Sequence, residues 1–165
     1  MEGSSSKPVL LAYDGSPAAR AAIEEAGRLF GRRPALVLTV WQSAESIAPA
    51  AVAGMPAAVV GRAVRELDAA AAAEVERLAA EGAELARAAG FDAEPRAVRS
   101  EGNVWVTICR SARDLDAGAV VVGSRGRSGI KSVLLGGISN GVVQHSSLPT
   151  LVVRASDDAA TQSRE

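Results

Sequence analysis

Four short, continuous apolar runs punctuate the chain, at residues 9–13, 35–40, 119–122 and 149–153. Runs of this kind suit the strands of a parallel sheet. The first three are typical of strands buried on both faces, and we expect the last to form an edge of the sheet. A fifth segment, 94–99, alternates apolar with charged residues and predicts a weaker strand near a sheet edge. The pattern therefore predicts five strands.

Between these runs, apolar residues recur at helical spacing. The first helix has the clearest limits, because Ser16 is a good N-cap, Pro17 suits the first helical position, and Gly31 suits the residue after the end. The four predicted helices span residues 17–30, about 61–89, about 104–112 and about 137–145.

The second predicted helix is the longest, and Gly90 ends it. Residues 42–60, which precede it, hold prolines and glycines among small residues, show no period, and predict a loop. The apolar stripe expected to face the sheet consists of Val64, Leu67, Ala71, Val75, Leu78, Leu85 and Ala89.

Strands and helices alternate along the whole chain. This order predicts a doubly wound α/β fold, in which a mostly parallel five-stranded sheet carries helices on both faces. We expect the strand order 3-2-1-4-5, which reverses between the first and fourth strands. Open sheets bind ligands at such a reversal, beyond the carboxyl ends of the strands. The two loops at that place are 14–16 and the segment that begins at Gly123.

Composition limits the possible partners and surroundings. The 165 residues fit one domain, which we place at 7–154, between disordered tails at 1–6 and 155–165. A net charge of −1 provides no basic field for nucleic acid, so we expect no such partner. The single cysteine fits a reducing compartment. Without an apolar signal segment or a run of about 18–20 apolar residues, we expect a cytoplasmic protein that does not associate with membranes.

A glycine-rich segment, here called the glycine stretch, covers residues 123–137, directly after a buried strand and before a helix. Glycines let main-chain N–H groups approach a ligand closely, and a helix start adds unpaired donors with a partial positive charge. Together these features predict an anion site, most naturally for phosphates, with added charge from Arg125, Arg127 and Lys131. The alternative is a flexible loop whose glycines only make turns.

Two common nucleotide motifs are absent. A phosphate-binding P-loop needs a different spacing before its lysine than the one around Gly129 and Lys131. The dinucleotide fingerprint should follow the first strand, where residues 14–16 do not supply it. A P-loop NTPase and a Rossmann dehydrogenase are therefore disfavoured.

Three segments resemble the universal stress protein family over most of the chain. The glycines at 123, 126 and 136 are similar to the G-2x-G-9x-G-[S/T] signature of its ATP-binding branch. Residues 9–16 resemble the family's first strand and its Asp-Gly-Ser turn, and residues 148–153 resemble its last strand.

The resemblance implies a site for ATP, with Mg²⁺ as a companion of the phosphates and no dedicated carboxylate cage. Asp14 would lie near the ribose or the adenine, the strand end at Val40 would meet the adenine edge, and Val122 would line the base. The glycines would wrap the phosphates. The predicted site consists of Ala12, Asp14, Val40, Val122, Gly123, Arg125, Gly126, Arg127, Gly136, Gly137, Ile138 and Ser139.

Gly137 departs from the family signature, which has Ser or Thr after the third glycine. The main-chain N–H is kept but a hydroxyl is lost. One hydrogen bond contributes roughly 0.5–1.5 kcal/mol, or about tenfold in affinity at the upper end. We expect binding to persist but to be weakened, with Ser139 as a candidate replacement for the missing hydroxyl.

Other polar and aromatic residues favour structural roles. We expect His145 to stabilise a helix end, Trp105 to pack, and Cys109 to lie in the core. Trp41 has two options, since it either flanks an adenine or covers the end of the sheet.

Three classes of function remain open. The favoured one is a nucleotide-binding stress or signalling module that acts through a protein partner as yet unknown. A rival is a slow ATP hydrolase or nucleotidyl-transfer enzyme, for which Asp14, Ser124, Ser128 and Ser139 are candidates without an evident base. A third is a dimer that binds no nucleotide. The resemblance also implies a homodimer formed through the last strand.

Overall fold

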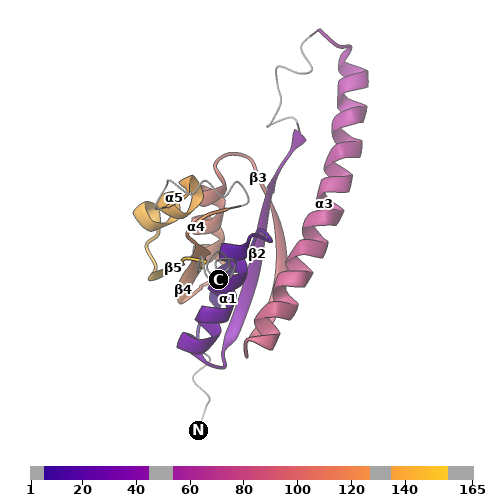
Figure 1. The fold of residues 1–165 in the computed structure, drawn as a ribbon. Coiled ribbons are helices and arrows are strands. Elements are labelled where there is room, and N and C mark those ends of the chain that lie inside the picture. The colour runs from indigo at the N-terminus through magenta and orange to yellow at the C-terminus, as the bar shows by residue number, and fades with distance from the viewer. Residues whose placement is uncertain (1–5, 45–53, 127–134, 156–165) are drawn as a thin grey trace, which may run out of the picture.

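The computed structural model describes residues 6–44, 54–126 and 135–155. These residues form a five-stranded, all-parallel sheet in the order β3-β2-β1-β4-β5 (Figure 1). The predicted fold class and strand order are therefore confirmed. The strands are β1 (Val9–Ala12), β2 (Pro34–Gln42), β3 (Asp92–Ser100), β4 (Ala119–Gly123) and β5 (Thr150–Val153).

Helices cover both faces of the sheet, as the alternating pattern predicts. Two of them, α1 and α3, pack on one face over a core centred on Leu11 and Val37, and the other two, α4 and α5, pack on the opposite face over Leu10 and Leu38 (Figure 1). The helices are α1 (Pro17–Phe30), α3 (Ala57–Ala88), α4 (Val104–Asp114) and α5 (Gly137–His145).

The limits of α1 agree with the sequence signals. The Ser16 hydroxyl accepts a hydrogen bond from the main-chain N–H of Ala19 at 3.1 Å, and Pro17 opens the helix. Gly31 follows its last residue with a φ of 63°, a conformation that strongly favours glycine. The chain thus turns sharply from β1 into α1 across residues 14–16, here called the Asp14 turn.

The loop predicted at 42–60 is partly wrong. The first turn of α3 begins at Ala57, four residues before the expected start at Gly61. Alanine is the best helix former, so Ala57 and Ala58 extend the helix although they add no apolar period. Residues 45–53, like most of the two predicted tails, lie outside the described residues.

The predicted apolar stripe of α3 is also partly wrong. The residues that α3 buries are Val75, Ala79, Gly82, Ala83 and Ala86, all in its C-terminal half.

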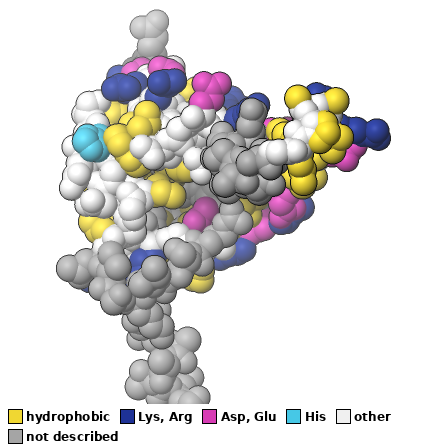
Figure 2. Space-filling view, turned by 90° about the horizontal axis from the view of Figure 1, so that it is seen from above, with side chains coloured by type: hydrophobic (Ala, Val, Ile, Leu, Met, Phe, Trp, Pro, Cys, Tyr) yellow, Lys and Arg dark blue, Asp and Glu magenta, His cyan; other side chains and the backbone are white. Residues whose placement is uncertain are grey.

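The N-terminal half of α3 instead projects past the sheet (Figure 1). Hydrophobic side chains gather at this end of the helix (Figure 2). In this half, Leu67 is 60% exposed and Val59 is 57% exposed. A helix of this length spans about 48 Å at 1.5 Å per residue, whereas a nine-residue strand spans about 30 Å. The N-terminal part of α3 therefore extends beyond the sheet. For this reason the helical spacing of apolar residues did not by itself identify which of them are buried.

Strand β3 forms one edge of the sheet, as its charged pattern predicts, and pairs with β2 from Asp92 to Ser100. Strand β5 forms the other edge and pairs with β4. In the part of the chain that the structure describes, no helix is long and apolar enough to cross a membrane.

Candidate functional site

The Asp14 turn lies where the strand order reverses, between β1 and β4. The Asp14 carboxylate accepts a hydrogen bond through Oδ1 from the main-chain N–H of Ser16 at 3.0 Å. Its second oxygen, Oδ2, lies 3.1 Å from the position that a Cβ on Gly126 would occupy. The turn is further joined to the glycine stretch because the Ser16 hydroxyl donates to the carbonyl of Arg125 at 3.4 Å.

The two ends of the glycine stretch meet at one carbonyl oxygen. The carbonyl of Ser124 accepts a hydrogen bond from the main-chain N–H of Gly136 at 2.7 Å and one from the Ser139 hydroxyl at 2.9 Å. The N–H of Ser124 donates to the carbonyl of Val153 at 2.7 Å. These contacts place the start of α5 beside the end of β4, and sequence analysis had no signal for them.

The buried Ser139 hydroxyl also lies 3.0 Å from the carbonyl of Gly136, within its own helix turn. Since its proton is directed at main-chain carbonyls, the geometry favours a structural role for Ser139. It does not support the prediction that Ser139 replaces the hydroxyl missing at position 137. Likewise, the main-chain N–H groups of Ser124 and Gly136 bind carbonyls and are not directed at a ligand.

The glycines of the stretch have different surroundings. A Cβ on Gly123 would lie 2.7 Å from the carbonyl carbon of Ala18 and 2.8 Å from the nitrogen of Ala19, so α1 packs directly on this residue. Gly137, by contrast, has no atom within 4 Å of its Cβ position among the described residues. Gly123 is therefore required by packing, whereas the space beside Gly137 is open.

The start of α5 has the features of an anion site. Gly136 is its N-cap, and the described residues provide no side chain that caps it. The first main-chain N–H groups of a helix have no acceptor within the helix, and those of Gly137 and Ile138 belong to this turn. Both residues are exposed. The helix end therefore presents donors and a partial positive charge toward solvent.

Three apolar residues of the predicted site belong to one hydrophobic cluster. Val122 is buried in it, and Ala12 and Val40 are partly buried against it. The strands β2, β1 and β4 that carry them are adjacent in the sheet. Ala12, Val40 and Val122, here called the apolar wall, thus lie near the carboxyl ends of these strands, on the face of the sheet that α4 covers.

Two predicted basic residues are not placed. Arg127 and Lys131 lie outside the described residues, as does Ser128. Arg125 is half-buried at the end of β4, next to Gly126.

A polar cluster that no sequence pattern indicated supports the Asp14 turn from α3. The buried Tyr13 hydroxyl donates to the Glu81 carboxylate at 2.6 Å, and Glu81 also pairs with Arg20 of α1. Burial and the bond to Glu81 raise the pKa of Tyr13 well above its ordinary value. The Tyr13 hydrogen bond, followed by the charge of Arg20, lowers the pKa of Glu81. In the sequence Glu81 is one of several acids on a long helix, and its spacing of four from Arg77 indicates only a pair within that helix.

The remaining aromatic residues have structural partners. Trp105 packs closely on Gly141, and its ring stacks on His145 at 4.4 Å, which places α5 against α4. The Arg99 guanidinium lies 5.8 Å from the ring centre of Trp41, an arrangement that favours the second option for Trp41, covering the sheet end. Cys109 is buried as predicted, and burial raises the pKa of its thiol.

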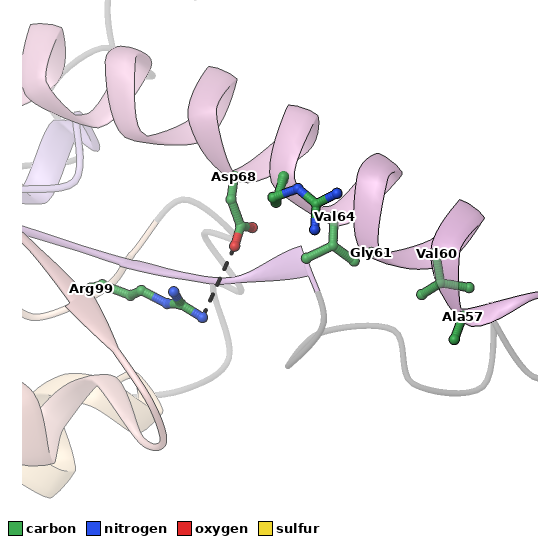
Figure 3. A pocket seen from close by; sticks show the side chains of 7 residues that line it. Ala57, Val60, Gly61, Val64, Asp68 and Arg99 are labelled. Carbon is green, nitrogen blue, oxygen red and sulfur yellow. Dashed lines mark ion pairs between the residues drawn. The ribbon is translucent and has the colours of Figure 1, made fainter.

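A pocket of about 480 Å³ lies away from the Asp14 turn, between the start of α3 and the end of β3 (Figure 3). Asp68 faces Arg99 across it at 4.0 Å and also accepts hydrogen bonds from Ser43 and the N–H of Ala44. The hydrogen bond from Ser43 is the main reason that the pKa of Asp68 is lowered. These contacts anchor the end of β2 to α3, and the pocket shares no residue with the glycine stretch.

Comparisons with solved structures confirm the fold. The hypothetical protein MJ0577 superposes with a TM-score of 0.75 at 21% identity, over 93% of this chain and 99% of that one. A universal stress protein solved in complex with cAMP has a TM-score of 0.58 at 24% identity, over 93% and 100%. A universal stress protein from Archaeoglobus fulgidus, solved in complex with dAMP, has a TM-score of 0.61 at 16% identity, over 90% and 98%.

Sequence comparisons identify the family. A universal stress protein from Mycolicibacterium smegmatis is 33% identical over 149 residues, which cover 89% of this chain and 45% of that relative. A second match aligns 68 residues, which cover 41% of this chain and 46% of that relative. The matched part of the chain therefore spans about half the length of each of these curated relatives. The model of the universal stress protein family matches residues 5–154. Taken with the fold and the signature glycines, this match shows that the chain belongs to the universal stress protein family.

Proposed function

We propose that this chain binds an adenine nucleotide, with ATP as the first candidate, at the carboxyl ends of the strands, between the Asp14 turn and the start of α5. The proposal rests on one observation above all. The Asp14 carboxylate lies next to Gly126, and the Ser124 carbonyl holds the start of α5 beside the same strand end. Two segments that are far apart in the sequence thus form one site at the reversal of strand order, where open sheets bind ligands.

In this site the phosphates lie against the first turn of α5. The main-chain N–H groups of Gly137 and Ile138 donate to phosphate oxygens, and the helix dipole favours their charge. Among the described residues, no atom crowds the Cβ position of Gly137, which leaves room for the phosphate chain on that side. Mg²⁺ would accompany the phosphates. The described residues contain no group of three or more acidic or metal-binding side chains that could form a separate metal site.

The base and the sugar lie toward β1 and β2. The base packs against the apolar wall of Ala12, Val40 and Val122, and the Asp14 carboxylate accepts a hydrogen bond from a ribose hydroxyl. Two family members with the same fold have been solved with cAMP and dAMP, which supports an adenine ligand. They do not discriminate between ATP and a monophosphate for this chain.

The first experiment is to identify the nucleotide released when the freshly purified protein is denatured. Equilibrium dialysis with labelled ATP, AMP and cAMP then ranks the ligands, with Asp14→Asn as the test variant and Asp92→Asn, at the opposite end of the sheet, as the matched control. We expect saturable ATP binding that Asp14→Asn weakens and Asp92→Asn leaves unchanged. No saturable binding at millimolar nucleotide contradicts the proposal and favours a dimer that binds no nucleotide.

The activity that we propose is nucleotide-dependent interaction with a protein partner, in a cytoplasmic stress or signalling role. A slow ATP hydrolase or nucleotidyl-transfer enzyme is the rival, and two of the residues that are candidates to position its water or nucleophile, Ser124 and Ser139, are buried. Phosphate release through many turnovers by the purified protein, abolished in Asp14→Asn, would favour the rival.

We also propose that the chain forms a homodimer through β5. The main-chain carbonyls of Pro149 and Val153 accept hydrogen bonds from the N–H groups of Val120 in β4 and of Ser124, the residue after it. The alternate residues Thr150 and Val152 therefore direct their N–H and carbonyl groups away from the sheet. An edge of this kind is a template for pairing with a second copy about a twofold axis.

Val152→Pro tests the dimer, because it removes an outward N–H and leaves the bonds to β4 in place. We expect light scattering to report a dimer for the parent protein and for Val152→Ala, and a monomer for Val152→Pro. A parent protein that is monomeric at micromolar concentration contradicts this proposal.

A further inference from the structure

Helix α3 holds both residues that flank Asp14. On one side, the Tyr13 ring packs so closely on α3 that a Cβ on Gly82 would lie 2.6 Å from its Cδ1 atom. On the other side, Gly15 has a φ of 79° and its Cβ position lies 3.1 Å from Cδ1 of Leu78. Tyr13 packs on α3 and Gly15 lies beside Leu78, so the turn that carries Asp14 lies against α3 on both sides of that residue.

Glu81 links three elements at this place. It accepts a hydrogen bond from the Tyr13 hydroxyl at 2.6 Å, pairs with Arg20 of α1, and receives a longer contact from Arg77 of α3 at 3.5 Å. The Arg20 guanidinium also lies 5.9 Å from the centre of the Tyr13 ring. The Tyr13 side chain is 2% exposed, so its hydroxyl has no ready substitute for Glu81 in solvent.

We propose that Glu81, acting through Tyr13, is a positioning residue of the nucleotide site: it sets the place of the Asp14 carboxylate and thereby the recognition of the ribose. The inference rests on the proposed function, because it assigns a role toward the same nucleotide. Glu81 touches no ligand itself. Its effect travels through the Tyr13 side chain to the turn that follows.

The test compares Glu81→Gln and Tyr13→Phe with a matched control, Glu84→Gln, which removes a carboxylate one turn further along α3 that pairs only with Arg87 among the described residues. Affinities for ATP and 2′-deoxyATP are measured by titration calorimetry for each variant, and Asp14→Asn provides the limit for lost recognition. Urea unfolding shows which variants are folded under the conditions of the titration. Tyr13→Phe loses a single oxygen atom and keeps the ring that packs on Gly82.

We expect Glu81→Gln and Tyr13→Phe to weaken ATP binding by about five- to tenfold, within the usual range for coupled sites. We also expect a smaller preference for ATP over 2′-deoxyATP, since a displaced Asp14 no longer meets the ribose hydroxyl. Glu84→Gln keeps both the affinity and the preference of the parent protein.

A purely structural role would lower both affinities together, so an unchanged preference overturns the inference whatever the loss of affinity. Unchanged affinity in both variants overturns it as well. If the parent protein binds neither nucleotide, the proposed function and this inference fail together. If the parent protein binds and discriminates but the variants match Glu84→Gln, only the inference fails.

Discussion

The two ends of the glycine stretch carry the same residue type for different physical reasons. At the first end, Gly123 lies against the main chain of α1, and even one added carbon would meet rigid atoms at 2.7 Å. At the second end, Gly137 has open space around it at the start of α5. The glycines of the signature therefore include one that packing requires and one that leaves room for a ligand. Only the contacts in the structure distinguish these two roles.

The comparison also separates stability from binding. Gly123 is the last residue of β4 and packs against α1, whereas Gly137 is exposed. Substitution at the first end should therefore change the free energy of unfolding, and substitution at the second end should change affinity.

We expect the largest effect from Gly123→Ala, on the free energy of unfolding. Because the added Cβ meets the main chain of Ala18 and Ala19, which has no flexible end to yield, the free energy of unfolding should fall by about 1–3 kcal/mol. Urea unfolding measures it, with Gly137→Ala as the control. That control should gain up to about 1 kcal/mol, since alanine restricts the unfolded chain at a helical position without strain. Equal losses in the two variants would refute the distinction.

Gly126→Ala tests the residue between the two ends. The added Cβ would lie 3.1 Å from Asp14 Oδ2, and a carboxylate at the end of a side chain shifts more easily than main chain. We therefore expect a small change in stability but a loss of ATP affinity approaching tenfold, the value of one hydrogen bond at the upper end of its range. Calorimetric titration beside urea unfolding separates the two effects. A large loss of stability with unchanged affinity would count against this role of Asp14.

Gly137→Ser restores the hydroxyl that the family signature has at this position. The open space beside Gly137 accommodates the side chain, and one added hydrogen bond to a phosphate should raise ATP affinity by about two- to tenfold. Gly137→Ala is again the control, because it adds the carbon without the hydroxyl. If both variants bind ATP equally well, the phosphates do not lie at the start of α5.

The smallest expected effect is the pH dependence that Glu81 adds at the Asp14 turn. The hydrogen bond from Tyr13, then the charges of Arg20 and Arg77, hold the pKa of Glu81 below its ordinary value of 4.5. A carboxylate whose pKa is lowered in the folded state stabilises the protein at pH values above its pKa in the unfolded state. That contribution is lost as the pH falls from the pKa of the unfolded state through the pKa of the folded state.

The measurement is the urea midpoint from about pH 7 to about pH 3 for the parent protein and for Glu81→Gln. The difference between the two should be constant near neutral pH and should shrink below pH 4.5. A difference that is independent of pH would show that the Glu81 charge does not stabilise the fold.

Much of the architecture was predictable from local signals. Apolar runs identified the buried strands, and Ser16, Pro17 and Gly31 set the limits of α1, because caps and φ preferences act on neighbouring residues. The stripe of α3 was predicted less well. Leu67 has the right period but lies beyond the sheet, since a helical period states which residues share a face and not how far the partner surface extends.

For the site, the sequence by itself determined which residue types lie at the reversal of strand order: an acidic turn after β1 and glycines after β4. Only the tertiary structure decided which glycine packs on α1, that Ser139 bonds the Ser124 carbonyl, and that Glu81 of α3 supports the turn through Tyr13. The reason is physical. Main-chain conformation is set over a few residues, whereas contacts between residues 68 positions apart depend on how whole elements pack.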